Sequence, residues 1–399
     1  MTTMRRAPEK RRPMKEMAYL AAFAVVSVLA LVGCGASANS SASPRPGDIT
    51  IKPVSDASGR AEPDQPIHCA ATHAKLTKVA VTRPNGSLVD GTLDTATGTW
   101  RPTHPLGLDA RYTVTATATG SAGTSVTKRL NIETIDPSGT VTAQSITPAT
   151  GAQVGDAQPV VVVFTKPVTD EAALQKALSV TDTHHVTGAW HWVTDRRVDY
   201  RPRTYWPLGD KITVTGDLDG VNAGKGLWAT GDYTHTFTVD SDVHAVVDPG
   251  TQSMAVYRGS RLLRKLPISS GGAHYRTWGG YLVVLDKEAK IRMTSCSVGL
   301  SCTPGSPDYY DLPVLWDVHL TWTGTYIHDA SWDNAAIGRV DNSHGCVHLS
   351  ASDAKWFYTT VTPGDLVQVI NPSKPVALDN GDGDWNLSWA RWSTPDATR

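Results

Sequence analysis

The stretch "NSHGCVHLS" places Cys346 two residues from a histidine on either side. A cysteine attacks as a thiolate, and a free thiol is mostly protonated at neutral pH, so a nucleophilic Cys346 needs a base or a positive field. His344 and His348 are neighbours in sequence, and His328 can meet Cys346 from an adjacent strand. Gly345 lets the backbone turn sharply and aim N–H groups at one point. Because a tetrahedral oxyanion requires two such donors, the stretch suits acyl transfer through a thioester.

The residue types alone leave three other roles open for this stretch. Alternating His344, Cys346 and His348 could bind zinc, but a structural zinc site has four protein ligands, and no Cys-x-x-Cys or His-x-x-x-His accompanies them. We therefore predict no metal and no cofactor. A buried inert thiol is the second alternative. A redox dithiol is the third, although it lacks a second cysteine at the usual spacing.

The N-terminal segment indicates export. Basic residues between positions 5 and 15 precede the apolar run "MAYLAAFAVVSVLALVG" at 17–33, which has the length of a signal h-region or a short membrane anchor. "LVGC" resembles a bacterial lipobox, so we predict a signal peptide over 1–34 with lipidation at Cys34. An uncleaved transmembrane anchor is the alternative. Either way, the rest of the chain is expected on the extracytoplasmic face of the cell membrane.

Export permits disulfides among the remaining four cysteines. Cys296 and Cys302 lie six residues apart in the Gly/Ser loop "SCSVGLSC" and could close a small ring. Cys69 falls in an alternating apolar pattern and is interpreted as a buried thiol. Cys346 is then left without a disulfide partner. The formal net charge of -1 gives no basic surplus, so we predict no nucleic-acid partner.

The chain is long enough for several domains, which must position these residues. After a Ser/Pro linker at 35–47, short alternating stretches predict one β-sandwich over 48–137 and a second over 138–241, both spacers or interaction modules. The second contains a helix capped by Thr169 or Asp170. A β-rich third domain spans 242–372, where Ser350 and Asp353 form the cap of a helix that follows Cys346. The tail, 373–399, contains three Trp and is expected to fold back on the third domain.

The spacing from His328 through "SHGCV", which begins at Ser343, resembles the signature of the L,D-transpeptidase (YkuD-type) catalytic domain. A lipobox, two immunoglobulin-like domains, the catalytic domain and a Trp-rich C-terminal extension resemble the actinobacterial members over nearly the whole mature chain. The resemblance implies a mainly β fold: two tandem immunoglobulin-like sandwiches followed by a β-rich catalytic domain with one or two helices.

The resemblance also implies roles for individual residues. Cys346 would attack a peptidoglycan tetrapeptide stem after its third residue, with His328 as the base. A second stem's side-chain amine would then take the acyl group, which gives a 3→3 cross-link. Backbone N–H groups of Gly345 and Cys346 would form the oxyanion hole, with His344 as a nearby alternative. The residues that fall at the family's substrate-contact positions are the lid tyrosine Tyr310, Thr323, Gly324 and His348.

Two positions depart from the family's pattern. His348 stands where Asn or Arg is usual, which puts donor recognition in doubt, and Asp329 stands where Ser is frequent. If only the backbone carbonyl of Asp329 orients His328 the change is tolerable, whereas a side-chain contact would raise the pKa of the base. A disulfide between Cys296 and Cys302 would stiffen the lid.

We therefore expect a lipid-anchored enzyme that binds peptidoglycan stem peptides and is inhibited covalently by carbapenems. A wall-binding or scaffolding lipoprotein with an impaired catalytic domain is the alternative. A sortase-like protein transpeptidase is remote, because the chain lacks the Thr-Leu-x-Thr-Cys strand and its following Arg.

Overall fold

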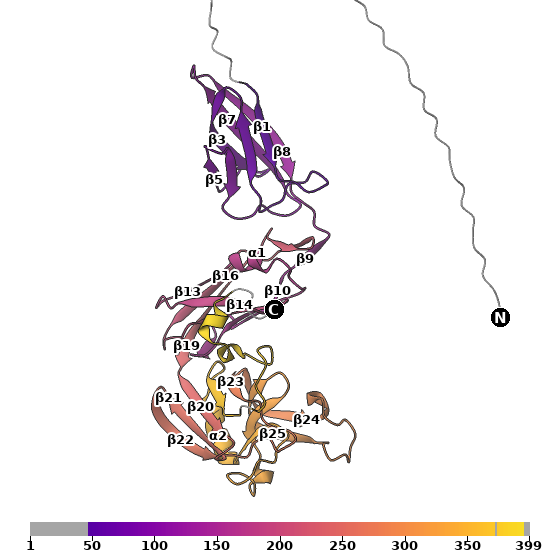
Figure 1. Ribbon diagram of the computed structural model, residues 1–399, viewed down its shortest axis with the longest axis vertical. Helices are drawn as coiled ribbons and strands as arrows, with labels where there is room; N and C mark the ends of the chain where they lie inside the picture. The colour runs from indigo at the N-terminus through magenta and orange to yellow at the C-terminus, as the bar shows by residue number, and fades with distance from the viewer. Residues whose placement is uncertain (1–46, 372, 395–399) are drawn as a thin grey trace, which may run out of the picture. The chain divides into compact units, whose positions relative to one another are not determined.

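The computed structural model describes residues 47–371 and 373–394. Cys34 and the expected signal peptide lie outside the described residues. The fold is mainly β, as the sequence predicts, and Figure 1 shows its three successive blocks. Within the described ranges, no helix has the length and apolar character needed to cross a membrane.

The first block is a sandwich of two four-stranded sheets around one apolar core. Alternating residues of its strands point inward, and Cys69 is one of them, a free buried thiol as expected. One sheet has the order β1 (Ile49–Pro53), β2 (Ile67–Ala71), β6 (Thr99–Pro102), β5 (Gly91–Asp94); the other has the order β4 (Leu88–Val89), β3 (Ala74–Thr82), β7 (Arg111–Gly120), β8 (Ser125–Glu133).

The second block is also a two-sheet sandwich with its own core. The helix α1 (Glu171–Lys176) is capped by Asp170, whose carboxylate accepts the N–H of Ala173. The sheets have the orders β10 (Ala143–Thr147), β12 (Val160–Phe164), β15 (Arg197–Pro202), β14 (Gly188–Thr194) and β11 (Gln153–Gly155), β19 (Tyr233–Ser241), β16 (Lys211–Gly216), β13 (Leu178–Asp182); a small third sheet is β17 (Asn222–Gly224), β18 (Leu227–Ala229), β9 (Gly139–Val141).

The third block contains two sheets and a helix that share one core. The helix α2 (Ala351–Thr360) packs on β25 and β26, and Ser350 caps it by accepting the N–H of Asp353, as predicted. The sheets have the orders β22 (Arg261–Pro267), β21 (Ser253–Arg258), β20 (Val243–Asp248), β28 (Leu366–Val369), β23 (Gly280–Val283) and β24 (Asp286–Thr294), β25 (Asp311–Thr321), β26 (Thr325–Asp329), β27 (Val347–Leu349); short 3-10 turns are η1 (Cys296–Val298) and η2 (Ser331–Asp333).

The described part of the tail, 373–394, contacts two blocks rather than the third alone. It contains the turn η3 (Asp384–Asn386) and the helix α3 (Trp389–Trp392). The Asn386 amide donates to the carbonyl of Tyr281 in the third block at 2.7 Å. Trp392, however, is fully buried and donates from Nε1 to the carbonyl of Ala189 in the second sandwich at 2.9 Å. The expectation that this tail packs on the third domain was therefore incomplete, because indole N–H groups find buried partners on the second sandwich.

Candidate active site

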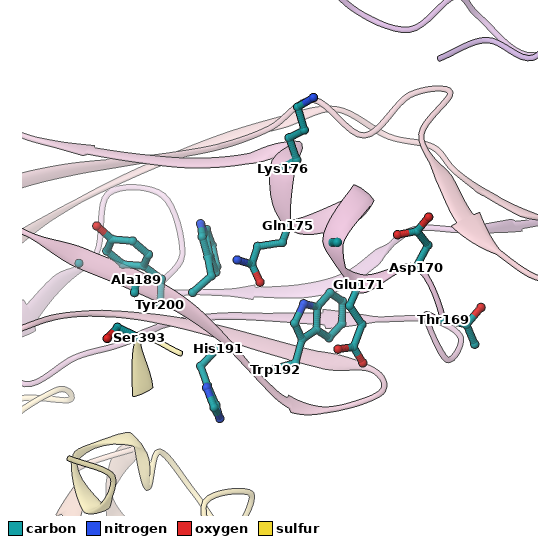
Figure 2. A pocket seen from close by; sticks show the side chains of 13 residues that line it. Thr169, Asp170, Glu171, Gln175, Lys176, Ala189, His191, Trp192, Tyr200 and Ser393 are labelled. Atoms are coloured by element: carbon teal, nitrogen blue, oxygen red, sulfur yellow. The ribbon is translucent and has the colours of Figure 1, made fainter. Parts of the chain in front are cut away.

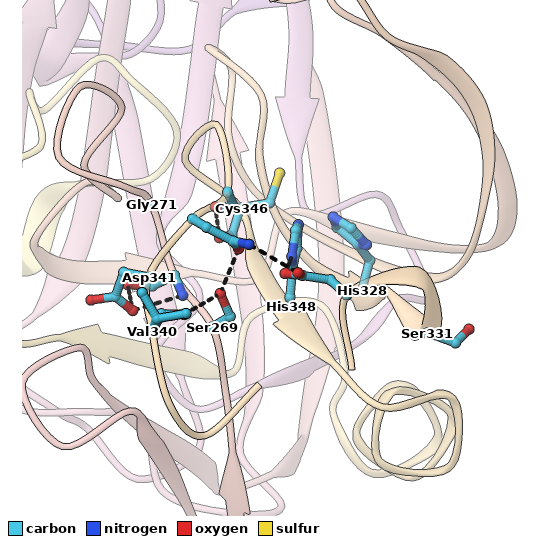
Figure 3. A network of polar contacts seen from close by, with 12 residues as sticks. Ser269, Gly271, His328, Ser331, Val340, Asp341, Cys346 and His348 are labelled. Atoms are coloured by element: carbon cyan, nitrogen blue, oxygen red, sulfur yellow. Dashed lines mark hydrogen bonds and ion pairs between the residues drawn. The ribbon is translucent and has the colours of Figure 1, made fainter. Parts of the chain in front are cut away.

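The parallel pair β26 and β27 brings the two histidines of the motif region together. His328 and His348 are register partners in this pair, and their ring centroids lie 5.0 Å apart. Val347 and Leu349 point into the core, so alternation along the strand places His348 on the opposite face, together with Cys346 just before the strand. Figure 3 shows the side chains of Cys346, His328 and His348 on the same side of the strands.

A cavity of about 180 Å³ lies over this face of the sheet. Its wall combines the thiol with imidazole, aromatic and aliphatic side chains. Five predicted site residues line the cavity, and Ser343, Gly345, Thr323 and Gly324 do not. The lining residues are Met293, Tyr310, Leu312, Val314, His328, Trp332, His344, Cys346 and His348.

Cys346 is a free cysteine, and at rest it is a neutral thiol. Its Sγ donates to the carbonyl of Gly324 at 3.6 Å. Burial raises the pKa of Cys346 to about 12, although a backbone hydrogen bond from Tyr326 acts in the opposite direction. The strand β27 separates Cys346 from the N-terminus of α2. A side chain in the cavity must therefore remove the proton from Sγ of Cys346.

His328 is held in the tautomer that a base requires. Its Nδ1 donates to the carbonyl of Asp329 at 2.8 Å, which leaves the lone pair of the neutral ring on Nε2. Burial and then the neighbouring His348 lower the pKa of His328 to about 3, while the Asp329 carbonyl opposes them. The Asp329 carboxylate instead accepts the N–H and hydroxyl of Ser331. Of the two alternatives for Asp329, the backbone contact is the one present.

The hydroxyl of Ser343 fixes the loop that leads to the nucleophile. Its buried Oγ donates to the carbonyl of Cys346 at 2.6 Å and accepts the N–H of Gly345 at 3.1 Å. Gly345 has φ +124°, which explains why glycine stands there. The Gly345 N–H, which was expected in the oxyanion hole, donates to the Ser343 hydroxyl in this structure. Within the described residues, the backbone N–H groups of His344 and Cys346 have no hydrogen-bond partner.

The backbone of Tyr310 is fixed beside a disulfide-bonded loop. Cys296 and Cys302 are joined by a disulfide. Ser295, directly before this ring, accepts the Tyr310 N–H with its hydroxyl at 3.0 Å. The Tyr310 ring lies 5.5 Å from that of His344, and burial raises the pKa of Tyr310 to about 12. Tyr310 therefore enters the cavity as a neutral phenol next to His344.

Thr323 and Gly324 lie in the turn between β25 and β26, and only Gly324 contacts the thiol directly. The Thr323 N–H donates to the side chain of Asn380 at 3.0 Å, so this backbone group is occupied by the C-terminal tail. Gly324 contributes the carbonyl that accepts the Cys346 thiol. Asn380 was not singled out from the sequence, and no local motif marks it, because it meets Thr323 across 57 residues.

The other residue that sequence reasoning missed is Asp333. Its carboxylate lies 2.8 Å from Nδ1 of His348 and also accepts the side-chain amide of Asn342 at 2.9 Å. Asp333 belongs to the short turn η2, which follows the β26 strand of His328. A carboxylate close after the base histidine in sequence was the available signal, but only the tertiary structure pairs it with His348.

A cavity of about 650 Å³ lies in the second sandwich between α1 and β14, and Figure 2 shows its lining, which includes Asp170, Gln175 and Trp192. No cysteine is among its described lining residues. A group of His, Cys, Asp and Glu side chains arranged to hold a metal ion is absent from the part of the chain that the structure describes. Of the two free cysteines in the described part of the chain, Cys346 lines a cavity together with histidines, whereas Cys69 belongs to the core of the first sandwich.

Comparison with known proteins agrees with this geometry. Residues 242–369 match the YkuD family, described as the L,D-transpeptidase catalytic domain, and residues 58–222 match a bacterial Ig domain. L,D-transpeptidase 2 of Mycobacterium tuberculosis is 32% identical over 335 residues, which cover 84% of this chain and 81% of that protein. L,D-transpeptidase 5 of the same species is 28% identical over 398 residues, 96% of this chain and 86% of that protein.

One solved structure of a relative matches more than half of this chain. The structure of the L,D-transpeptidase LdtMt1 in complex with imipenem matches with a TM-score of 0.50 and 32% identity, over 59% of this chain and 100% of that one. The family model and the relatives identify the same family. The chain belongs to the L,D-transpeptidase family.

Proposed function

We propose that this protein is a peptidoglycan L,D-transpeptidase that forms 3→3 cross-links through a thioester on Cys346. The observation that carries the proposal is the cavity that holds the Cys346 thiol together with His328, whose Nε2 is available as a base. Membership of the transpeptidase family supports the reaction class. The presence of Asp329 in place of the usual Ser does not argue for an impaired domain, because its carboxylate accepts hydrogen bonds from Ser331 and not from His328.

In the acylation step, Sγ of Cys346 attacks the carbonyl after the third residue of a tetrapeptide stem. The Sγ proton passes to Nε2 of His328, and His328 returns it to the amine of D-alanine as the C–N bond breaks. Because the thiol and the imidazole are both neutral at rest, proton transfer accompanies attack instead of preceding it. The substrate is therefore needed before a thiolate is formed.

The tetrahedral oxyanion is expected to lie against the backbone N–H groups of Cys346 and His344. Support comes from the engagement of the Gly345 N–H with Ser343, which leaves the two flanking donors. Removing one such donor typically costs about 2.7–4 kcal/mol of transition-state stabilisation. Tyr310 would close over the bound acyl group, and His348 would contact the substrate from the strand β27.

The acyl group would then pass to the side-chain amine of a diamino acid in a second stem. Export and lipidation at Cys34 would place this reaction outside the cell membrane, with the two sandwiches as a stalk that carries the third block into the wall. A multiply acylated N-terminal cysteine anchors firmly, whereas one acyl chain does not. Release of the protein from membranes after Cys34→Ser would test this part separately.

Covalent inhibition by a carbapenem tests the nucleophile. LdtMt1 was solved in complex with imipenem, and a strained β-lactam carbonyl would acylate Cys346 as the stem does. We expect the intact mass of the protein to rise by one imipenem, with the adduct mapped to Cys346. Cys346→Ala should abolish the adduct. Cys69→Ser, which changes the free thiol buried in the first sandwich, should retain it. An unmodified wild-type mass after prolonged incubation would refute the proposal.

A further inference from the structure

The cavity contains a second imidazole whose environment differs from that of His328. His348 is fixed at its backbone, since its N–H donates to the carbonyl of Ser269 at 2.7 Å. Its side chain is nearly buried, and its ring faces that of His328 at 5.0 Å. Figure 3 shows the two rings side by side next to Cys346. Both rings therefore line the same reaction space.

The partners of the two Nδ1 atoms distinguish the two histidines. His328 faces a neutral carbonyl, that of Asp329, whereas His348 faces the carboxylate of Asp333 at 2.8 Å. A carboxylate stabilises an imidazolium far more than a carbonyl does, because the charges attract in a site with little water. The amide of Asn342 holds the other oxygen of Asp333 in place. Burial lowers the pKa of His348, and the Asp333 carboxylate opposes this shift. Because His328 has only a carbonyl in that place, His348 is the ring that more readily accepts a proton.

The proposed transfer step releases more protons than one ring can hold. A side-chain amine enters as an ammonium ion, because its ordinary pKa is about 10.4. It loses one proton before it attacks the thioester and a second as the amide forms. The departing thiolate of Cys346 takes one of these protons. The other needs a separate acceptor.

We propose that His348, held by Asp333, is the general base that deprotonates the acceptor ammonium ion. This inference rests on the proposed function. Nε2 of His348 takes one ammonium proton, and the neutral nitrogen attacks the thioester carbonyl. The C–S bond breaks, and the second amine proton passes through His328 to Sγ. His348 then releases its proton to solvent, so that the net reaction converts ammonium and thioester into amide, thiol and one proton.

The test separates transfer from acylation in single-turnover experiments. Wild type is acylated with a disaccharide-tetrapeptide, then mixed with a second stem or with hydroxylamine, a nucleophile that is largely unprotonated at neutral pH. His348→Asn keeps a donor toward Asp333 and removes the base. We expect transfer to the stem amine to fall by about 100-fold or more, which is the usual contribution of a general base, and by more than acylation falls.

Transfer to hydroxylamine should fall much less in His348→Asn, because this nucleophile needs no prior deprotonation. Asp333→Asn should give an intermediate loss with the stem amine. His184→Asn is the matched control, because His184 also pairs with a carboxylate, that of Asp210 at 3.0 Å, but lies in the second sandwich. Its rates should equal those of wild type.

Two results would overturn the inference: His348→Asn transfers to the stem amine as fast as wild type, or it loses the same factor with both nucleophiles. If wild type forms no acyl-enzyme with the tetrapeptide, the proposed function fails as well. If His348→Asn shows normal acylation and normal transfer, the role of His348 as a base is refuted and the proposed function is not affected.

Discussion

Removal of the Ser343 hydroxyl should disable the active-site loop without touching the nucleophile. This single Oγ accepts the Gly345 N–H and donates to the Cys346 carbonyl, and it is buried. Ser343→Ala leaves both backbone groups without a partner. Each buried polar group without a hydrogen bond costs about 1–3 kcal/mol, so the loop loses about 2–6 kcal/mol of its preference for the observed geometry. If the lower figure of about 2 kcal/mol is added in full to the activation free energy of acylation, the rate falls about 30-fold.

The assay is the rate of acylation by imipenem, followed by intact mass at several times. Ser253→Ala is the control, because Ser253 lies in the same block and its hydroxyl contacts only the exposed hydroxyl of Thr251. The control should react at the wild-type rate. An acylation rate within a few-fold of wild type for Ser343→Ala would show that the hydroxyl does not position the nucleophile.

Three further outcomes follow from the pKa values and the backbone of the third block. Alkylation of Cys346 by iodoacetamide, measured by peptide mapping, should keep accelerating beyond pH 10, because burial raises the pKa of this thiol to about 12; a plateau by pH 9 would contradict this. Burial and nearby carboxylates raise the pKa of Asp317 to about 8. Its protonated form therefore contributes stability that is complete below its unfolded pKa of about 3.9 and lost as the pH rises through 8. Urea unfolding of Asp317→Asn should show a weaker loss of stability over this range, and parallel curves would refute the shift. Gly324→Ala should slow acylation, because its Cβ would overlap Val298 in the disulfide ring, whereas Gly299→Ala, which has a similar positive φ but open space, should not; equal rates for the two variants would exclude the clash as the cause.

The chemistry of the site was accessible from the sequence to the extent that it depends on strand alternation. A thiol and His348 two residues apart share a face when the backbone is extended. The pairing of the His328 strand with this one is tertiary, and the structure shows it. The capping pattern of Ser350 and Asp353 is likewise local, and the structure confirms it. Such features follow from residues within a few positions of one another.

Contacts that depend on tertiary packing could not be predicted in this way. Asn380 reaches Thr323 from the tail, and Asp333 reaches His348 across a turn, and neither pairing has a sequence period. Sequence could not distinguish the donors of the oxyanion loop either, because the consecutive N–H groups at Gly345 and Cys346 look equivalent until the Ser343 hydroxyl engages one of them. Side-chain competition for backbone groups decides such cases.

The central claim is that Cys346 forms a thioester with a peptidoglycan stem and passes it to a second stem. Mass spectrometry of the purified protein with a disaccharide-tetrapeptide tests it directly. We predict an acyl-enzyme at Cys346 that has lost the terminal D-alanine, followed by a dimer with a 3→3 cross-link, and neither species from Cys346→Ala. Absence of both species from wild type, or the same dimer from Cys346→Ala, would contradict the account.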